Sequence, residues 1–218
     1  MPNADFRIIR SARRTRIALR VGDDGVLEVL APPRVSETLL RRMVEEQSAV
    51  IAGLLARAAR RPKPELRDGE MFMLLGEPYP LRLTRRLRLF DHGFLIPDGD
   101  FEAKKAAMVE LYRELAGIMI PRRVEFFQDL CGIRPDKVRI NSAETRWGSC
   151  SGKRTLSFSW KLIQCPREAV DYVVVHELSH LHEMNHSPAF WRRVGAVLPD
   201  YATRRRRLHE FARALPRW

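Results

Sequence analysis

The chain has 218 residues and a formal net charge of +12, with 45% hydrophobic and 30% charged residues. That length suits one domain or two small ones, and the composition is ordinary for a soluble globular protein. No apolar run approaches the roughly 20 residues of a membrane span, and the N-terminus lacks the apolar core of a signal peptide, so we expect a cytoplasmic protein without membrane contact.

The arginine and cysteine residues further limit the class of protein that the sequence can encode. Arginine supplies most of the positive charge in pairs and short runs spread along the whole chain, whereas a nucleic-acid reader usually concentrates them on one stripe. We therefore expect non-specific attraction of nucleic acid rather than dedicated recognition. The cysteines, Cys131, Cys150 and Cys165, are odd in number and form no Cys-x-x-Cys pair, which argues against a disulfide framework and against a zinc ribbon.

Short strands on either side of a helix are predicted for the N-terminal part of the chain. Residues 6–33 have the alternating pattern and the glycine-rich turn of a hairpin. Ser36 is placed to cap a helix that runs to about Arg60, where prolines follow. Further short strands are predicted within residues 71–96.

A turn at residues 97–100 is the expected seam of the chain, because it contains Pro, Gly and two Asp residues. It separates an N-terminal α+β region, residues 1–98, from a C-terminal region, residues 99–218. The C-terminal region opens with a helical pattern over residues 101–130, which Pro121 is expected to kink or split.

The remaining elements alternate between strands and helices. Residues 138–141 and 156–162 have the period-two pattern of strands and are expected to form a hairpin. Pro166 opens a helix whose expected C-cap is Asn185, a residue that tolerates the left-handed conformation. Two more helices follow, the last over residues 201–215.

The most informative segment holds four of the six histidines, between His176 and His186. His176 and His180 flank Glu177 in the pattern His-Glu-x-x-His on a predicted helix. Residues four apart lie about 40° apart around a helix, so both imidazoles point the same way and can share one ion at Zn–N distances of about 2.1 Å. Glu177 lies about 100° away, where its carboxylate can take a proton from a water activated by the ion. The segment predicts a zinc site with a general base.

A catalytic zinc needs a third protein ligand and an open position, and His186 is the best candidate for that ligand. It lies beyond the expected helix end at Asn185, so the chain can turn and bring its imidazole back. His182 lies about 240° around the helix from His176 and is expected to face elsewhere. A structural zinc without chemistry is disfavoured, because such sites are rich in cysteine and no cysteine lies nearby.

Four segments carry a resemblance to a known family. They are residues 145–150 (TRWGSC), 158–163 (FSWKLI), 171–178 (DYVVVHEL) and 185–191 (NHSPAFW). Together they closely resemble the YgjP-like metallopeptidase family, bacterial zincins related to the SprT and WLM groups. The match is specific over about residues 137–213 and looser over the rest of the chain.

The resemblance implies an α+β fold with a zincin-like core, in which a β-hairpin or sheet rim lies over the His-Glu-x-x-His helix, together with an N-terminal region of short strands and helices. It implies a zinc-dependent metallopeptidase that hydrolyses polypeptides. His176, His180 and His186 would be the Zn²⁺ ligands, and Glu177 the catalytic acid/base.

The rim is also where the resemblance places the substrate. In zincins a rim strand pairs with an extended peptide through main-chain hydrogen bonds, and here that segment would be either residues 141–146 or the strand 156–162. For stabilisation of the transition-state oxyanion, the sequence offers Arg146, Asn141 and Tyr201.

Other readings of the site remain open. The ligand spacing equals that of metzincins, but Glu183 occupies their glycine position and no methionine follows His186 to form a Met-turn. A gluzincin-type third ligand would have to be Glu210, since no other glutamate follows Glu183. Two alternative functions also stand: a nucleic-acid-associated, SprT-like protease that docks through its basic surface, and a non-enzymatic zinc-binding module, against which the intact Glu177 argues.

Overall fold

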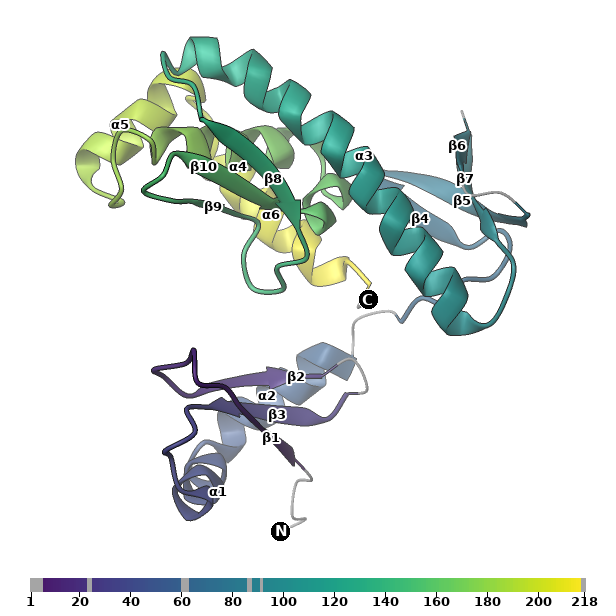
Figure 1. Ribbon diagram of the computed structural model, residues 1–218, viewed down its shortest axis with the longest axis vertical. Helices are drawn as coiled ribbons and strands as arrows, with labels where there is room; N and C mark the ends of the chain where they lie inside the picture. Colours follow the sequence, from purple (N-terminus) through teal and green to yellow (C-terminus); the bar gives the residue numbers. More distant parts are fainter. Residues whose placement is uncertain (1–5, 23–24, 60–62, 86–87, 91, 217–218) are drawn as a thin grey trace. The chain divides into compact units, whose positions relative to one another are not determined.

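Small mixed sheets and helices make up the chain, which confirms the α+β fold class (Figure 1). The computed structural model describes residues 6–22, 25–59, 63–85, 88–90 and 92–216. The chain divides into two compact units, one of Met1–Pro64 with Ala214–Trp218 and one of Glu65–Arg213. None of the helices in the described ranges is long and apolar enough to cross a membrane.

A sheet packed against helices forms the first unit. Its elements are β1 (Phe6–Arg10), β2 (Ala18–Val21), β3 (Leu27–Ala31), α1 (Glu37–Glu46) and α2 (Ser48–Ala59). The core joins Leu27 and Val29 of β3 to Leu40 of α1 and Ile51 of α2. The expected hairpin is only partly right, because β2 is antiparallel to β3 whereas β1 pairs with β3 in parallel. Alternation along a strand reports a buried face and not the direction of its partner.

The helix expected from Ser36 to about Arg60 is divided in the structure. Ser36 caps α1 as expected, since its side chain accepts a hydrogen bond from the Leu39 N–H. α1 ends at Glu46, because its C-cap Gln47 has a φ of −102° and a ψ of 21°, outside the helical range, and α2 follows at once. Arg60 itself lies outside the described residues.

The second unit opens with a sheet in the order β4-β5-β7-β6 and a long helix beside it (Figure 1). These elements are β4 (Met71–Leu74), β5 (Glu77–Thr84), β6 (Arg88–Phe90), β7 (Gly93–Pro97) and α3 (Phe101–Leu130). Tyr112 fixes the helix to the sheet: its hydroxyl donates to the Met73 carbonyl at 2.8 Å, and its ring lies 5.3 Å from that of Phe94. The strands before the turn at residues 97–100 thus pack with the helix after it, so the two compact units do not divide at the expected seam.

α3 runs unbroken through Pro121, so of the expected kink or split the split is wrong, and the kink stays a prediction. Buried Ile120 and Val124 hold the helix against its neighbours on either side of the proline. α3 packs against β7 and against three later elements, β8 (Lys137–Asn141), the short helix η1 (Trp160–Gln164) and α4 (Arg167–Ser179), and it therefore spans both sheets of the second unit (Figure 1). Asp100 caps its first turn by accepting from the Ala103 N–H.

A second small sheet, in the order β8-β10-β9, precedes the histidine helix. Its strands are β8 (Lys137–Asn141), β9 (Gly148–Cys150) and β10 (Thr155–Ser159), followed by the 3₁₀ helix η1 (Trp160–Gln164). The expected hairpin between residues 138–141 and 156–162 is wrong, since β8 and β10 are parallel, and β9 is the antiparallel neighbour of β10. The strand also ends at Ser159, because Trp160, Leu162 and Ile163 are all buried in η1 rather than alternating between faces.

The helix that carries the histidine motif is almost fully buried. It is α4 (Arg167–Ser179), and α5 (Pro188–Val197) and α6 (Tyr201–Ala214) follow it. The expected C-cap at Asn185 is wrong, because α4 ends at Ser179 with His180 as its C-cap. Near its start, Asp171 is clamped between the Nε of Arg123 at 2.6 Å and Nη1 of Arg204 at 3.9 Å. This ion-pair cluster ties α4 to α3 and α6.

Candidate metal centre

Three imidazoles converge at the end of α4. The Nε2 atom of His176 lies 3.2 Å from Nε2 of His180 and 3.1 Å from Nε2 of His186, and the three candidate ligand atoms lie within 4.8 Å of one another. Tetrahedral ligands at Zn–N distances of about 2.1 Å are separated by about 3.4 Å, so this spacing suits a shared divalent ion. The three ring nitrogens face one another. A cation placed between them would be attracted by their lone pairs, and this also favours a shared ion.

The third histidine, His186, reaches the cluster because the helix ends early. α4 stops at Ser179, a tight turn follows, and Ser187 caps α5 by accepting from the Phe190 N–H at 3.3 Å. Phe190 is fully buried, and its ring centroid lies 4.9 Å from that of His176, 4.5 Å from His180 and 4.8 Å from His186. One aromatic ring of α5 therefore packs against all three imidazoles and limits their rotation. In the sequence, Phe190 stood out only as part of the segment 185–191 that carries the family resemblance.

A hydrogen bond sets the tautomer of His180. Its Nδ1 lies 3.0 Å from the main-chain oxygen of Glu183, and a carbonyl only accepts, so Nδ1 carries the proton and donates it. The neutral ring then presents a bare Nε2 to the other two histidines, as a metal ligand must. The main chain of Glu183, and not its side chain, makes this contact. His182 is exposed and is not part of the cluster, as expected, although it lies in the turn after α4 and not on the helix.

Burial favours the neutral form of two of the clustered imidazoles, those of His176 and His180. The pKa of His176 is lowered from 6.5 to about 3, mainly because the ring is desolvated and also because His180, His186 and Arg205 add positive charge nearby. Desolvation lowers the pKa of His180 in the same direction. Neutral rings at ordinary pH leave ring nitrogens available as ligands.

Glu177 is a buried carboxylate beside the cluster. It is 5% exposed, and its Oε2 atom has no hydrogen-bond partner among the residues that the structure describes. Desolvation raises its pKa from 4.5 to about 8. The positive charge of Arg146 acts in the opposite direction and lowers the pKa. An unpaired buried carboxylate is costly, so its retention here points to a task in chemistry rather than in folding.

Gly148 of β9 makes room for that carboxylate. A Cβ atom built on Gly148 would lie 2.6 Å from both Cγ and Oε1 of Glu177 and 2.8 Å from its Cδ. No side chain fits in this space without moving Glu177. The sequence contained a weak signal for this contact, since a glycine inside a strand often marks the close approach of another group.

The other predicted site residues have different surroundings. Arg146 is exposed, and its charge acts on Glu177. The side-chain oxygen of Asn141 accepts from the Ala143 N–H at 3.0 Å, so it supports the local turn after β8. Tyr201, the first residue of α6, stacks on Trp191 at 5.2 Å. Their roles toward a substrate remain predictions.

An aromatic group lines the side of the cluster that is formed by α5 and α6. The Trp191 ring stacks on His186, with centroids 5.7 Å apart and an interplanar angle of 29°, and it lies 5.9 Å from His176. Tyr172, one helical turn before His176, has its ring 5.8 Å from that imidazole. The histidines thus have aromatic neighbours from α4 and α5. An aromatic residue of α6 extends this group by packing on Trp191.

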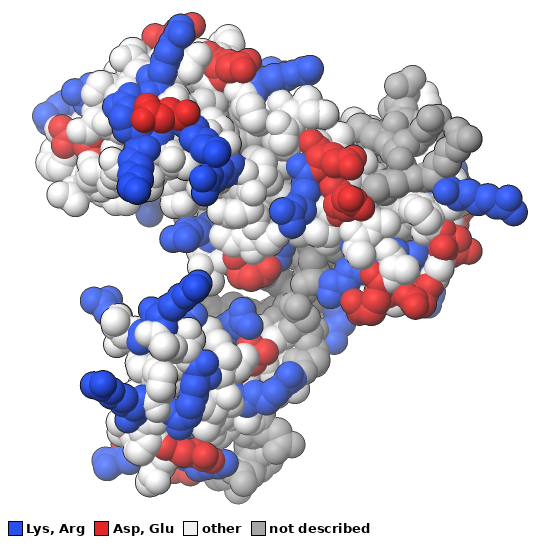
Figure 2. Space-filling view, viewed as in Figure 1, with Lys and Arg blue, Asp and Glu red and all other residues white. Residues whose placement is uncertain are grey.

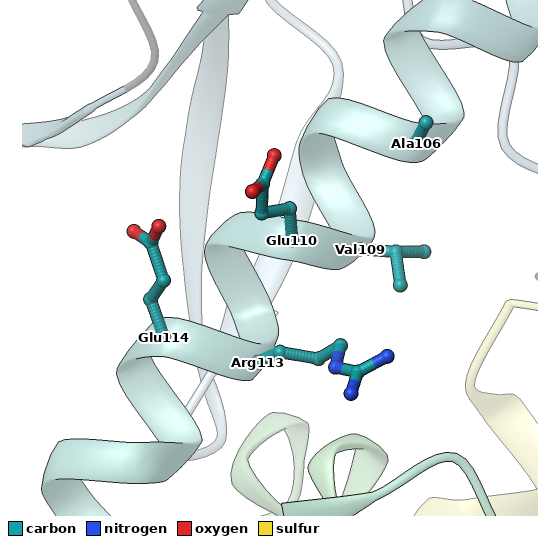
Figure 3. Close-up of a pocket in the computed structure, with 5 residues that line it drawn as sticks. All are labelled: Ala106, Val109, Glu110, Arg113 and Glu114. Carbon is teal, nitrogen blue, oxygen red and sulfur yellow. The ribbon is translucent and has the colours of Figure 1, made fainter.

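A separate hollow lies along α3, where Figure 3 shows side chains from successive turns of the helix. It is lined by Ala106, Val109, Glu110, Arg113 and Glu114. None of these residues is a histidine or cysteine, and none belongs to the cluster at the end of α4. The chemistry-bearing residues are therefore at the histidine cluster and not at this hollow.

Comparison with known proteins agrees with the resemblance seen in the sequence. The family model described as "YgjP-like, metallopeptidase domain" matches residues 15–211. No curated protein matches the chain. Among solved structures, the chain is similar to the metallopeptidase zymogen of Pyrococcus abyssi abylysin, with 25% sequence identity, 45% of this chain and 100% of that one covered, and a TM-score of 0.41. The family match spans most of the chain, so the protein belongs to the YgjP-like metallopeptidase family.

Proposed function

We propose that this protein is a zinc-dependent peptidase in which His176, His180 and His186 hold the ion and Glu177 transfers protons. The observation that carries this proposal is the convergence of three Nε2 atoms beside a buried, unpaired carboxylate. Zn²⁺, when bound, supplies a Lewis acid that polarises a peptide carbonyl and acidifies a water molecule.

The task of Glu177 follows from its position and charge. Its carboxylate accepts a proton from the attacking water and later delivers that proton to the departing amine nitrogen. Burial disfavours the ionised form that this step needs, whereas the charge of Arg146 and a divalent ion in the site both favour it. Gly148 keeps the carboxylate in place, because the backbone of β9 lies directly against it.

β9 is the strand best placed to bind an extended substrate. β10 has β8 on one side and β9 on the other, so the expected pairing of substrate with residues 156–162 is wrong. Hydrogen bonds from Ser159 N–H to Trp147 O and from Ser151 N–H to Thr155 O fix the register of β9. In an antiparallel pair the intervening residues point their N–H and C=O groups outward, so we infer that Gly148 and Cys150 offer theirs to a peptide.

Metal content and turnover of matched variants test the proposal. The wild-type protein is expected to contain about one zinc per chain and to cleave an unfolded test protein. Glu177→Gln should keep the metal and lose turnover, whereas His186→Ala should lose both. His182→Ala is the matched control, because this exposed histidine lies outside the cluster. A Glu177→Gln variant as active as the wild type would refute the proposed mechanism.

The two alternative functions find less support. Figure 2 shows basic side chains scattered over the visible face rather than gathered in one stripe, an arrangement that favours non-specific attraction of nucleic acid. DNA binding that stimulates proteolysis would support a nucleic-acid-associated protease, and binding no stronger than that of any protein of charge +12 would exclude it. A zinc-binding module without activity has no use for the unpaired Glu177 carboxylate.

A further inference from the structure

The arginine run of α6 contains side chains in different electrostatic situations. Arg204 pairs with Asp200 at 2.8 Å and approaches Asp171, and Nη1 of Arg207 lies 3.4 Å from Oε1 of Glu168. Arg205 has no such carboxylate partner within the part of the chain that the structure describes. Its guanidinium instead lies over the Trp191 ring, 5.6 Å from the centroid. Arg205 is therefore an exposed cation whose charge no acidic side chain of those residues balances.

Arg205 is also the arginine of this run that lies next to the histidine cluster. Its platform, Trp191, stacks on His186 with a centroid distance of 5.7 Å. These two distances place the guanidinium no more than about 11 Å from the His186 ring. Burial lowers the pKa of His176 and raises the pKa of Tyr172, and the charge of Arg205 adds to the first shift and opposes the second, which agrees with this placement.

An arginine on an aromatic platform is prepared to bind an anion. The guanidinium is partly immobilised by its contact with the ring, and its outer N–H groups keep the planar fork that matches a carboxylate in two hydrogen bonds. Packing against Trp191 therefore lowers the entropy cost of binding an anion and does not neutralise the charge of Arg205.

We propose that Arg205 is a specificity-determining residue that binds a carboxylate of the substrate on the α6 side of the metal centre. This inference rests on the proposed peptidase function. An extended peptide advances about 3.4 Å per residue, so the bound carboxylate belongs to a residue within about three positions of the cleaved bond. The carboxylate comes either from an acidic side chain or from the C-terminus of the peptide.

Matched peptides distinguish these two sources. One series replaces Gln by Glu at each of three positions on either side of the cleaved bond, and a second compares a free C-terminus with an amide. For the wild type we expect kcat/KM to be about tenfold higher with the carboxylate in one of these places. A side-chain source gives the preference in the first series, and a terminal source gives it in the second.

Three variants of the run test the residue itself. Arg205→Gln should reduce the preference to within about twofold, and Arg205→Glu should invert it in favour of a Lys-containing peptide. Arg205→Lys should recover only part of the preference, since an ammonium lacks the planar fork. Arg206→Gln removes the neighbouring charge and is the matched control, which should keep the wild-type preference.

Equilibrium binding supplies a second readout that does not depend on turnover. The same peptides are titrated against zinc-loaded Glu177→Gln protein, with and without Arg205→Gln, and the carboxylate peptide should bind about tenfold more tightly only when Arg205 is present. If neutral and acidic peptides are cleaved and bound equally well, or if Arg205→Gln keeps the preference, the Arg205 assignment is overturned while the peptidase function stands. If no peptide is bound or cleaved, both are overturned.

Discussion

The two ends of α4 each bury an acidic side chain, and the two carboxylates have opposite surroundings. Asp171, near the start, is 8% exposed and lies between Arg123 and Arg204, so its charge is neutralised by ion pairs. Glu177, near the end, is 5% exposed and has an oxygen without a partner among the described residues. The first arrangement stabilises the fold, whereas the second costs stability and leaves a carboxylate available for chemistry. Under the proposed mechanism, the helix thus combines a structural end with a reactive end.

Among the substitutions that test this difference between Asp171 and Glu177, the largest expected effect is a loss of catalysis. Glu177→Gln keeps the size of the side chain but removes its ability to accept a proton, so turnover should fall by about 100- to 10,000-fold. Peptide cleavage under saturating substrate measures the change, and metal content measured on the same sample should not change. Loss of metal together with activity would assign Glu177 a ligand role instead.

Asp171→Ala should act on stability rather than on chemistry. Removal of one partner of a buried ion pair leaves Arg123 without its main counter-charge, and we expect a loss of about 3 kcal/mol in the free energy of unfolding. Urea unfolding checks the value. Glu37→Ala, which breaks the exposed Glu37–Arg41 pair of α1, is the comparison and should cost less than about 0.5 kcal/mol. Equal costs for both variants would contradict the structural role of Asp171.

Gly148→Ala tests whether the position of the Glu177 carboxylate matters. The added methyl group would occupy space within 2.6 Å of Cγ of Glu177, so the carboxylate must move. A displacement of about 1 Å is expected to lower kcat by roughly 100-fold, with a smaller change in KM. Gly152→Ala, in the turn between β9 and β10, meets no atom within 4 Å and should leave kcat unchanged. Similar kcat values for both variants would show that Glu177 tolerates the shift.

The smallest expected effect is a pH dependence of stability that comes from Glu177. In the metal-free protein the pKa of Glu177 is raised to about 8, so between pH 4.5 and 8 the folded state keeps a proton that the unfolded chain releases. Glu177 therefore lowers stability as pH rises through this window. The stability gained by Glu177→Gln should grow by about 1 kcal/mol per pH unit from pH 5 to 7. A gain independent of pH would mean that Glu177 is ionised throughout.

The sequence predicted the histidine cluster because its information is local. A spacing of four residues on a helix places His176 and His180 together whatever the rest of the chain does. The turn that returns His186 was also foreseen, although the helix ends earlier than expected, because the His180 imidazole bonds to the Glu183 carbonyl and the chain must bend to allow it.

Contacts between distant segments were not predictable in the same way. The alternation in residues 156–162 reports a strand but not its neighbours, so the parallel pairing of β8 with β10 was missed. Gly148 and Glu177 are far apart in sequence and meet only because β9 packs on α4. The contact of Phe190 with all three imidazoles likewise depends on how α5 folds back.

Zinc stoichiometry, measured by elemental analysis on protein purified without chelators, tests the central claim most directly. The account predicts about one zinc per chain in the wild type, in Glu177→Gln and in His182→Ala, and almost none in His176→Ala, His180→Ala or His186→Ala. A wild-type protein that contains no zinc and takes up none when it is supplied would contradict the account, as would a His186→Ala variant that binds zinc as tightly as the wild type.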